Sequence, residues 1–168
     1  MKILIDDLLE YSRVETRAKH KEWFNPEDIV KEVLDNLYLQ IQEKKANIEV
    51  NSNIRAIKAD RSQLQQVIQN LVNNSLKFNE NNPKITISID ENSTHWVFVI
   101  EDNGIGLNTK YRDKILEPFK RLHTNEEYIG TGMGLAICKR IVDRHKGNID
   151  IESKVGHGSK FIFSLLKE

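Results

Sequence analysis

Two glycine-rich stretches, separated by a long and mostly polar segment, constrain this chain more than any other feature. The first, residues 104–106, follows an apolar run at 96–100 and the carboxylate of Asp102, and the second, residues 130–134, leads directly into an apolar helical segment. Glycine lets backbone amides approach an anion closely, because it has no Cβ and tolerates a positive φ. The chain lacks the Gly-Lys-Ser/Thr of a P-loop, and its glycines are too far apart for a Rossmann turn. The two stretches therefore predict a nucleotide pocket of another kind.

A helix is predicted over residues 61–78, upstream of both stretches. Asp60 is placed as its N-cap, and Gln63 three residues later completes a capping-box pattern. Apolar side chains recur at helical spacing, which gives the helix one face for a core. These side chains are Leu64, Val67, Ile68, Leu71 and Phe78.

Two asparagines and a lysine, Asn70, Asn74 and Lys77, form a stripe along the edge of that apolar face. At about 100° per residue, Asn74 projects only about 20° from Val67, where an unpaired amide is costly. Neutral carbonyl oxygens suit a Mg²⁺ ion bridged to phosphates, and a lysine one turn later supplies a positive charge for a phosphate. We therefore predict a metal and phosphate function for this stripe, whereas Asn73 is expected to be an ordinary solvated residue on the far face.

Five short motifs, taken in order, resemble the N, G1, F and G2 boxes and the terminal glycine-containing strand of sensor histidine kinases. Each motif alone is moderately specific, but five in the right order and spacing are a strong signal. The resemblance covers nearly the whole chain from about Asn25 onward, and the segment before the second glycine stretch is similar to phytochrome-like and PAS-linked bacterial kinases. The motifs are Asn-Leu-Val-Asn-Asn-Ser-Leu-Lys-Phe (70–78), Asp-Asn-Gly-Ile-Gly (102–106), Glu-Pro-Phe-Lys-Arg-Leu (117–122), Gly-Thr-Gly-Met-Gly-Leu (130–135) and Gly-His-Gly-Ser-Lys-Phe (156–161).

The resemblance implies an α+β fold, the two-layer α/β sandwich called the Bergerat or GHKL ATP-binding fold, in which helices cover one face of a mixed, mostly antiparallel sheet. Residues 1–18 resemble the remnant of the second dimerisation-hairpin helix, 19–24 a charged connector, and 25–168 the ATP-binding catalytic domain. Periodicity predicts the elements separately. They are helices at 3–14, 26–43, 61–78, 110–115 and 133–145, and strands at 47–50, 56–59, 84–90, 95–101, 147–153 and 159–165.

The resemblance also assigns residues to adenine nucleotide binding. It implies that Asp102 accepts a hydrogen bond from the adenine amino group and that Ser159 helps to hold the adenine edge through water. The first glycine stretch would pass close to the nucleotide, and the second would wrap the phosphates at the N-terminus of the following helix. The implied nucleotide-binding residues are Asp102, Gly104, Ile105, Gly106, Arg121, Gly130, Thr131, Gly132, Met133, Gly134, Leu135 and Ser159.

The resemblance further makes Asn70 and Asn74 the ligands of Mg²⁺, and Asn70 and Lys77 the catalytic residues. The polar segment between the two glycine stretches is the expected mobile lid. From this lid we expect Arg121 to reach a phosphate. His123 has no neighbouring ligand set and is not expected to bind a metal.

Composition is consistent with a nucleotide-binding signalling domain. The chain has 25 basic and 25 acidic side chains, so it carries no electrostatic footprint for nucleic acid. The single cysteine, Cys138, excludes an intramolecular disulfide framework and is expected to fill a core. No apolar run approaches the roughly 20 residues that span a bilayer, and acidic residues near the N-terminus argue against a signal peptide. We expect a cytoplasmic domain that does not itself insert into a membrane, whether or not its parent protein is anchored.

A histidine kinase also needs an acceptor histidine on its dimerisation helix, usually beside Glu or Asp, and no histidine here has that context. The implied reaction is transfer of the γ-phosphoryl group of Mg·ATP to a histidine on a separate dimerisation domain, with a response regulator receiver domain downstream. Catalysis by this half would be mostly positioning and charge neutralisation, and the chain alone would not label itself. The five histidines are His20, His95, His123, His145 and His157.

Three alternatives stay open. A hydrolytic ATPase of the same fold places a general-base Glu one turn before the metal Asn, where this chain has Asn70, which cannot take a proton from water. An anti-sigma-type serine kinase is disfavoured by the helix remnant at residues 8–14. A nucleotide-binding interaction module without phosphotransfer is disfavoured by the intact phosphate-site residues. The sequence names neither the sensed signal nor the cognate response regulator.

Overall fold

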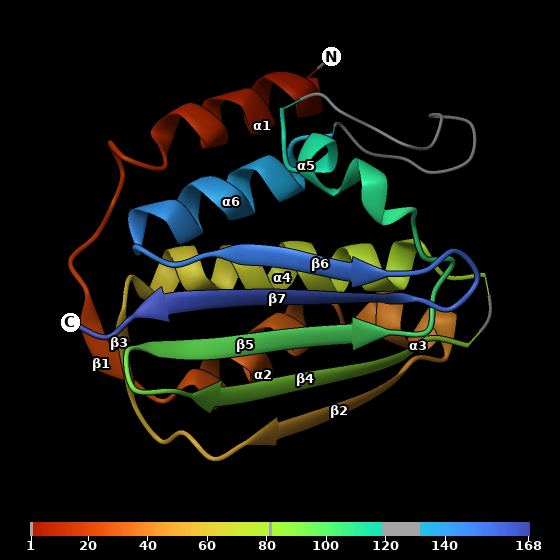
Figure 1. Cartoon of the computed structure of the whole chain (residues 1–168), viewed down its shortest axis with the longest axis horizontal. Coiled ribbons are helices and arrows are strands. Elements are labelled where there is room, and N and C mark those ends of the chain that lie inside the picture. Colours follow the sequence, from red (N-terminus) through yellow and green to blue (C-terminus); the bar gives the residue numbers. More distant parts are fainter. Residues whose placement is uncertain (1, 81, 119–131) are drawn as a thin grey trace.

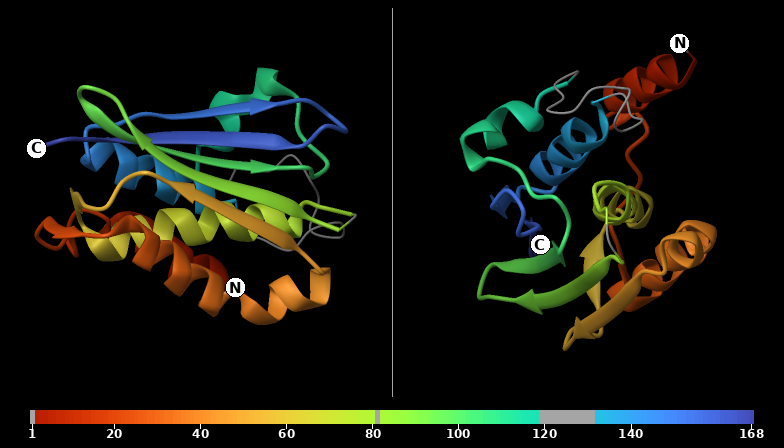
Figure 2. Two further views of the ribbon diagram at one scale, coloured as in Figure 1. Left: turned by 90° about the horizontal axis from the view of Figure 1, so that it is seen from below. Right: turned by 90° about the vertical axis from the view of Figure 1, so that its right-hand side faces the viewer.

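The structure, a computed structural model, describes residues 2–80, 82–118 and 132–168 and has two layers. A five-stranded sheet forms one layer, and helices cover one of its faces (Figures 1 and 2). The strand order is β2-β4-β5-β7-β6; β2 and β4 run parallel, and the other neighbours run antiparallel. The predicted α+β sandwich with a mixed, mostly antiparallel sheet is confirmed. The strands of this sheet are β2 (Asn47–Ser52), β4 (Lys84–Glu91), β5 (His95–Asp102), β6 (Ile149–Ser153) and β7 (Ser159–Leu166).

The central strands carry the alternation expected of a sheet with one covered face. On β5, Trp96, Phe98 and Ile100 are buried, while the residues between them are partly exposed. Phe98 stacks on Phe163 of β7 with ring centroids 4.7 Å apart. Because side chains alternate along a strand, these residues all point to the helical layer. The sheet therefore holds the end of β5, and with it Asp102, in a fixed place.

The helical layer is built around α4, which packs against α2 on one side and α6 on the other. Four of the five predicted core residues of α4 are fully buried, and Phe78, at its C-cap, is half-buried. The predicted N-cap is confirmed, because the Asp60 side chain accepts a hydrogen bond from the Gln63 amide. The helices are α1 (Lys2–Arg13), α2 (Pro26–Asn36), α3 (Tyr38–Lys44), α4 (Arg61–Lys77), α5 (Arg112–Ile115) and α6 (Gly134–Arg144), with a 3-10 turn, η1, at Thr109–Tyr111.

The prediction of one helix over residues 26–43 is wrong, because the helix divides at Leu37. Leu37 has left the helical conformation (φ −98°, ψ 10°), and it both ends α2 and precedes α3. Its side chain is buried, whereas the next two residues, Tyr38 and Leu39, are exposed. Burial of Leu37 in the core favours this bend over a straight continuation, which the local pattern could not indicate.

The predicted connector contains a strand that the sequence did not indicate. β1 (Glu22–Phe24) pairs antiparallel with β3 (Ile57–Ala59), the residues just before α4. Trp23 of β1 also lies edge-on to Trp96 of β5, with ring centroids 6.0 Å apart. This segment is therefore part of the folded body, and the domain boundary at residue 25 stays a prediction.

A buried polar cluster fastens the residues before β1 to the body. The Asp60 carboxylate accepts hydrogen bonds from the Lys19 amide (2.7 Å) and from Arg144 of α6 (3.3 Å). Arg144 also donates to the Gln63 side-chain oxygen (2.7 Å), and the Gln63 amide group donates to the Val14 carbonyl (2.7 Å). Asp60 therefore joins the N-terminus of α4, the end of α6 and the connector at one point.

The first helix, α1, lies along α6 on the side away from the sheet (Figure 1). The Arg140 guanidinium of α6 lies over the Tyr11 ring, 4.7 Å from its centroid, and Val14, just after α1, is buried. Four apolar side chains of α1 are nevertheless exposed. They are Leu4, Ile5, Leu8 and Leu9.

Candidate nucleotide site

Asp102 stands at the end of β5 and is held by hydrogen bonds from three sides. Its Oδ2 accepts from the Ser75 hydroxyl of α4 at 2.8 Å. Its Oδ1 accepts from the Gly104 amide of the following loop at 2.9 Å and from the Ser159 amide of β7 at 3.2 Å. The helix layer, the sheet and the first glycine stretch thus meet at one carboxylate, at the strand end where the sequence placed it. Its role in nucleotide selection stays a prediction.

The surroundings of Asp102 act on its ionisation in opposite directions. Burial raises the pKa of Asp102 above its ordinary value and is the largest effect, and Glu101 raises it further. The hydrogen bonds from Gly104, Ser75 and Ser159 lower the pKa, because each one favours the charged form. The net direction is upward.

The first glycine stretch is packed against the protein's own backbone. A Cβ on Gly104 would collide with the Phe78 carbonyl oxygen, which also accepts the Ile105 amide at 3.0 Å. Gly106 has φ +68°, a conformation that favours glycine, and a Cβ there would collide with the Lys154 carbonyl. These contacts show that the glycines tie the loop to α4 and to the β6–β7 turn. Their predicted approach to a nucleotide stays a prediction.

Two asparagines that the sequence did not single out complete this tie. The buried Asn79, just beyond α4, donates to the Asn103 side-chain oxygen at 2.8 Å. The same oxygen accepts the Lys84 amide at the start of β4, also at 2.8 Å. Asn103 therefore fixes the loop that follows Asp102 to two other elements. Its position inside an Asp-Asn-Gly turn is the one local signal, but its partners are far away in the sequence.

The hydroxyl of Ser159 is directed to a second serine. Ser159 Oγ lies 2.8 Å from Ser153 Oγ of β6, and Ser153 also donates to the Gly158 carbonyl at 2.8 Å. Ser153 in turn accepts the Leu107 amide at 2.9 Å. The predicted role of Ser159 at the adenine edge is not tested by these contacts, but its backbone amide is the part that touches Asp102.

The polar stripe predicted along the edge of the apolar face of α4 lies beside the start of α6. The Asn70 side-chain amide donates to the Gly134 carbonyl at 3.3 Å, so its nitrogen is turned to α6. Asn74 is half-buried, and its side chain makes no hydrogen bond within the described residues. Lys77 is half-buried, with its ammonium 5.5 Å from the centre of the Phe78 ring. The structure thus brings the asparagine helix and the second glycine stretch together.

Only the end of the second glycine stretch belongs to the described residues. Gly132 has φ +78°, Met133 is fully buried, and Gly134 and Leu135 begin α6. Gly134 faces Asn70, whose nearest atom would lie 3.9 Å from an added Cβ. The other residues named for this region, Phe119, Lys120, Arg121, His123, Gly130 and Thr131, lie outside the described residues.

The elements that surround this site belong to a known protein family. Residues 59–168, which include α4, Asp102, the start of α6 and β7, match the family model described as histidine kinase-, DNA gyrase B-, and HSP90-like ATPase. The chain belongs to this family. The predicted resemblance is thus confirmed, and the ATPase domain is of the histidine kinase or GHKL type.

Relatives with known names agree. The chain is 46% identical over 166 residues to the phytochrome-like protein Cph1 of Synechocystis sp., and 42% identical over 166 residues to cyanobacterial phytochrome A of Nostoc sp.. Each match covers 98% of this chain but only 22% of the relative, so the chain spans about a fifth of those proteins.

Solved structures show the same architecture. The catalytic domain of histidine kinase ThkA has a TM-score of 0.78 at 28% identity, with 89% of this chain and 99% of that domain covered. ThkA in complex with the response regulator TrrA gives a TM-score of 0.81 at 26% identity, with 99% and 47% covered. The sandwich of this chain is therefore that of a histidine kinase ATPase domain.

A cysteine thiol and a histidine imidazole, two groups that often act in catalysis, are buried and have structural roles in this ATPase domain. Burial raises the pKa of the Cys138 thiol to about 12, so it stays protonated, as expected of a core residue. His145 is buried, and its Nε2 accepts the Asp60 amide at 3.2 Å, while its Nδ1 donates to the Ile141 carbonyl at 2.9 Å. Burial lowers the pKa of His145, which keeps it neutral. Both ring nitrogens are thus used structurally.

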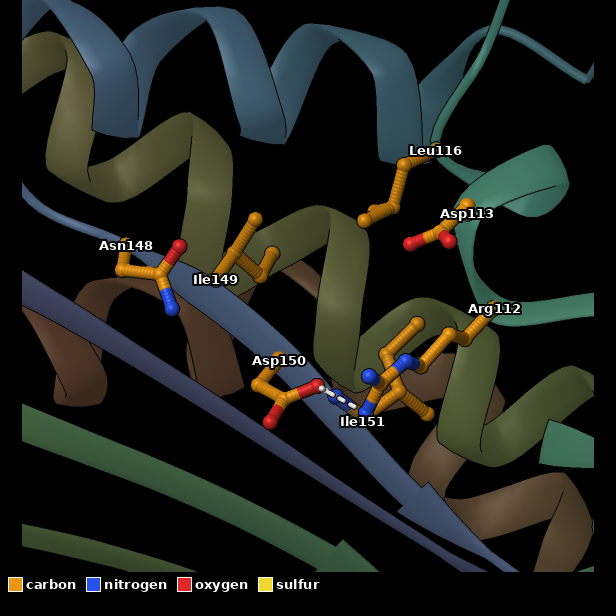
Figure 3. Close-up of a pocket in the computed structure, with 7 residues that line it drawn as sticks. All are labelled: Arg112, Asp113, Leu116, Asn148, Ile149, Asp150 and Ile151. Atoms are coloured by element: carbon orange, nitrogen blue, oxygen red, sulfur yellow. Dashed lines mark hydrogen bonds and ion pairs between the residues drawn. The ribbon is translucent and has the colours of Figure 1, made fainter. Parts of the chain in front are cut away.

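A cavity of about 210 Å³ lies elsewhere on the ATPase domain, between α5 and β6 (Figure 3). Arg112 reaches across it to Asp150, with Nη1 and Oδ1 3.2 Å apart. Both side chains are about half exposed, so this ion pair contributes little to stability. No predicted nucleotide residue lines the cavity. Its lining residues are Arg112, Asp113, Leu116, Asn148, Ile149, Asp150 and Ile151.

The described residues contain neither a membrane-spanning helix nor a clustered metal site of the usual acidic, His and Cys ligands. No helix in residues 2–80, 82–118 and 132–168 has the length and apolar character needed to cross a bilayer. Within the same ranges, no group of three or more His, Cys, Asp or Glu side chains is arranged to hold a metal ion. The predicted Mg²⁺ ligands are asparagine oxygens, which do not belong to these ligand types.

Proposed function

We propose that this chain binds Mg·ATP and transfers the γ-phosphoryl group to a histidine on a dimerisation domain of its parent protein. One observation carries the proposal. The partly buried carboxylate of Asp102, held from three elements, and the asparagine stripe of α4 lie in one domain of the histidine kinase ATPase family. A base-selecting group and a phosphate-facing group are the two parts that such a site needs.

Asp102 would bind the base. Its carboxylate can only accept hydrogen bonds when it is ionised, and the exocyclic amine of adenine is a donor. The corresponding group of guanine is a carbonyl, which would face the carboxylate without a donor between them. We therefore expect adenine nucleotides to be preferred.

The asparagines of α4 fit a magnesium ion. Asn74 offers a half-buried amide with no hydrogen-bond partner among the described residues, and the nitrogen of Asn70 is spent on Gly134, which leaves its oxygen available. Amide oxygens are suitable ligands for this hard cation, which when bound would supply positive charge to neutralise the phosphates. Asn70 and Asn74 would hold the ion, and Lys77 would attract a phosphate as a positive charge.

The transfer step itself needs little chemistry from the protein. The bond between the γ-phosphorus and its bridging oxygen breaks, a bond to an acceptor imidazole nitrogen forms, and ADP leaves with the bridging oxygen. The acceptor supplies the electron pair from that nitrogen, and the proton on its other ring nitrogen passes to water or to a carboxylate beside the acceptor. Asn70 lies where a hydrolase would have a base, and an amide cannot take a proton from water. Slow hydrolysis is the consequence, which preserves ATP for the acceptor.

The partners follow from the same proposal. The acceptor would be a dimerisation domain, because no histidine of this chain has an acceptor context, and His145 is buried with both ring nitrogens engaged. A response regulator would receive the phosphoryl group next, which is supported by the structural similarity to ThkA, a kinase that forms a complex with the response regulator TrrA. Residues 1–18 would be the end of the dimerisation hairpin.

A phosphotransfer assay tests the proposal. The purified chain, incubated with γ-labelled ATP and Mg²⁺, should not label itself, but it should label a supplied dimerisation-hairpin domain of its parent protein. The label should be acid-labile and alkali-stable, as a phosphohistidine is. Strong self-labelling at a histidine of this chain would contradict the missing acceptor. ATP binding without transfer to a folded acceptor would instead favour a nucleotide-binding interaction module.

The metal role of Asn74 gives a second prediction. Asn74→Ala should reduce the tightening of ATP binding that Mg²⁺ causes by about tenfold, or about 1.4 kcal/mol, because a direct ligand is lost. Binding of ATP in the presence of a chelator should change little. Thermal-shift titrations with and without Mg²⁺ measure both. Asn73→Ala, on the same helix, is the matched control. An unchanged magnesium dependence in Asn74→Ala would make Asn74 a structural residue.

A further inference from the structure

Ser75 lies in the interior of α4 with its hydroxyl buried, although serine is not a favoured residue inside a helix. Only 2% of its surface is exposed. Serine is a modest helix former, and a buried polar group costs free energy unless it is hydrogen-bonded. Its hydroxyl donates to Asp102 Oδ2 at 2.8 Å, and this is its one hydrogen bond within the described residues. The donor capacity of this hydroxyl is thus directed to the nucleotide-selecting carboxylate.

The two oxygens of Asp102 are held differently. Oδ1 accepts two backbone amides, from Gly104 and Ser159, whereas Oδ2 accepts the Ser75 hydroxyl alone. Oδ2 therefore keeps the larger remaining acceptor capacity. Among these three donors, only Ser75 uses its side chain. The other two are backbone amides, which almost any residue at those positions would provide. The rotation of the carboxylate, and the direction in which its open acceptor site points, depend on this serine.

We infer that Ser75 is a positioning residue for nucleotide selectivity, which orients Oδ2 of Asp102 to accept a hydrogen bond from the adenine amine. The inference rests on the proposed function and deepens it.

Because the Asp102 carboxyl can titrate, loss of the Ser75 hydrogen bond should change the pH dependence of ATP binding, which a loss of packing alone would not do. Glu101 is the charged neighbour that raises the pKa of Asp102; α4, β7 and the loop present Ser75, Ser159 and Gly104, which are uncharged. The Ser75 hydrogen bond lowers the pKa of Asp102. Loss of that bond raises the pKa, so more of the carboxyl is protonated. A protonated carboxyl can donate to the guanine carbonyl, which weakens the preference for ATP.

The experiment measures binding of ATP and GTP to the full chain by calorimetry, in a chelator so that the metal ligands do not contribute. Ser75→Ala should weaken ATP binding about tenfold, as expected for a hydrogen bond to a charged group. GTP binding should change much less, so the ATP/GTP affinity ratio falls. The pH below which ATP binding declines should shift upward relative to wild type.

Two further variants separate orientation from packing. Ser75→Thr keeps the hydroxyl and should restore the ratio, whereas an equal loss in Ser75→Thr and Ser75→Ala would assign the effect to packing and overturn the inference. Ser62→Ala is the matched control, because Ser62 on the same helix donates to another aspartate, Asp60, at 2.9 Å. It should bind ATP like wild type.

The outcomes distinguish this inference from the proposed function. If wild type does not bind ATP, the proposed function fails. If wild type binds ATP and Ser75→Ala keeps the same ATP/GTP ratio and the same pH dependence, only the role of Ser75 is overturned. Thermal unfolding of each variant shows that the compared proteins are folded.

Discussion

Replacement of Asp102 by alanine should reduce ATP affinity by about a hundredfold, or about 2.7 kcal/mol, the range expected when a hydrogen bond to a charged group is lost. The carboxylate lies at the end of β5, where donors from three elements fix it. Wild type should bind ATP far more tightly than GTP, and the variant should bind both weakly and nearly equally. Calorimetry with both nucleotides measures the effect.

Asp150→Ala is the matched control for that experiment. Asp150 is an aspartate of the edge strand β6, and it accepts its neighbour's amide (Ile151, 2.8 Å) and pairs with Arg112. It lies at the cavity of Figure 3, away from the site, and its loss should leave ATP binding unchanged. Equal affinities of wild type for ATP and GTP, or full ATP affinity in Asp102→Ala, would remove Asp102 from the proposed site.

Asp60→Ala should lower the free energy of unfolding by about 3 kcal/mol, because it leaves a largely buried Arg144 guanidinium without the carboxylate that balances its charge. Asp60 is fully buried and accepts from the Lys19 amide, Arg144 and the Gln63 amide. The variant should also loosen the connector, because the Lys19 amide loses its acceptor. Urea unfolding measures the stability, and amide hydrogen exchange at Lys19 measures the connector.

Asn25→Ala tests whether capping alone explains the result. Asn25 caps α2, and its side chain accepts the Glu27 amide at 3.0 Å, but it joins no buried ion pair among the described residues. Loss of such a cap costs about 1 kcal/mol. A loss in Asp60→Ala no larger than that in Asn25→Ala would show that the cluster around Asp60 adds nothing beyond the cap.

Features that depend on neighbouring residues were predictable from the sequence. The N-cap and buried face of α4 follow from residue spacing, and so does the alternation of β4 and β5, since both patterns are local. The position of Asp102 after an apolar strand and before a glycine stretch was sufficient to place it at a strand end. The order of the five motifs was sufficient for the family. Each of these inferences needed no knowledge of distant contacts.

The features that were missed depend on contacts across the fold. β1 is three residues long, and its partner β3 is more than thirty residues away, so no local pattern marks it. Ser75 looks like a neutral helix residue until Asp102 is placed against it. The sequence indicates that residue 104 must be small, but it does not indicate that a Cβ there would collide with the Phe78 carbonyl oxygen. The lid residues at 119–131 lie outside the described ranges, so their roles stay predictions.

The pairing of β1 with β3 bears on where a shorter version of this protein can be cut. A piece that begins at residue 25 would keep every predicted nucleotide residue, but it would remove the β1 ladder, the Lys19 amide at Asp60 and the link from Lys21 to Glu168 (2.7 Å) near the other end of the chain. If such a piece failed to bind ATP, the cause would be its lower stability and not the loss of a binding residue. A cut before Val14 keeps these contacts, so a trimmed protein from that point is the right one for titrations.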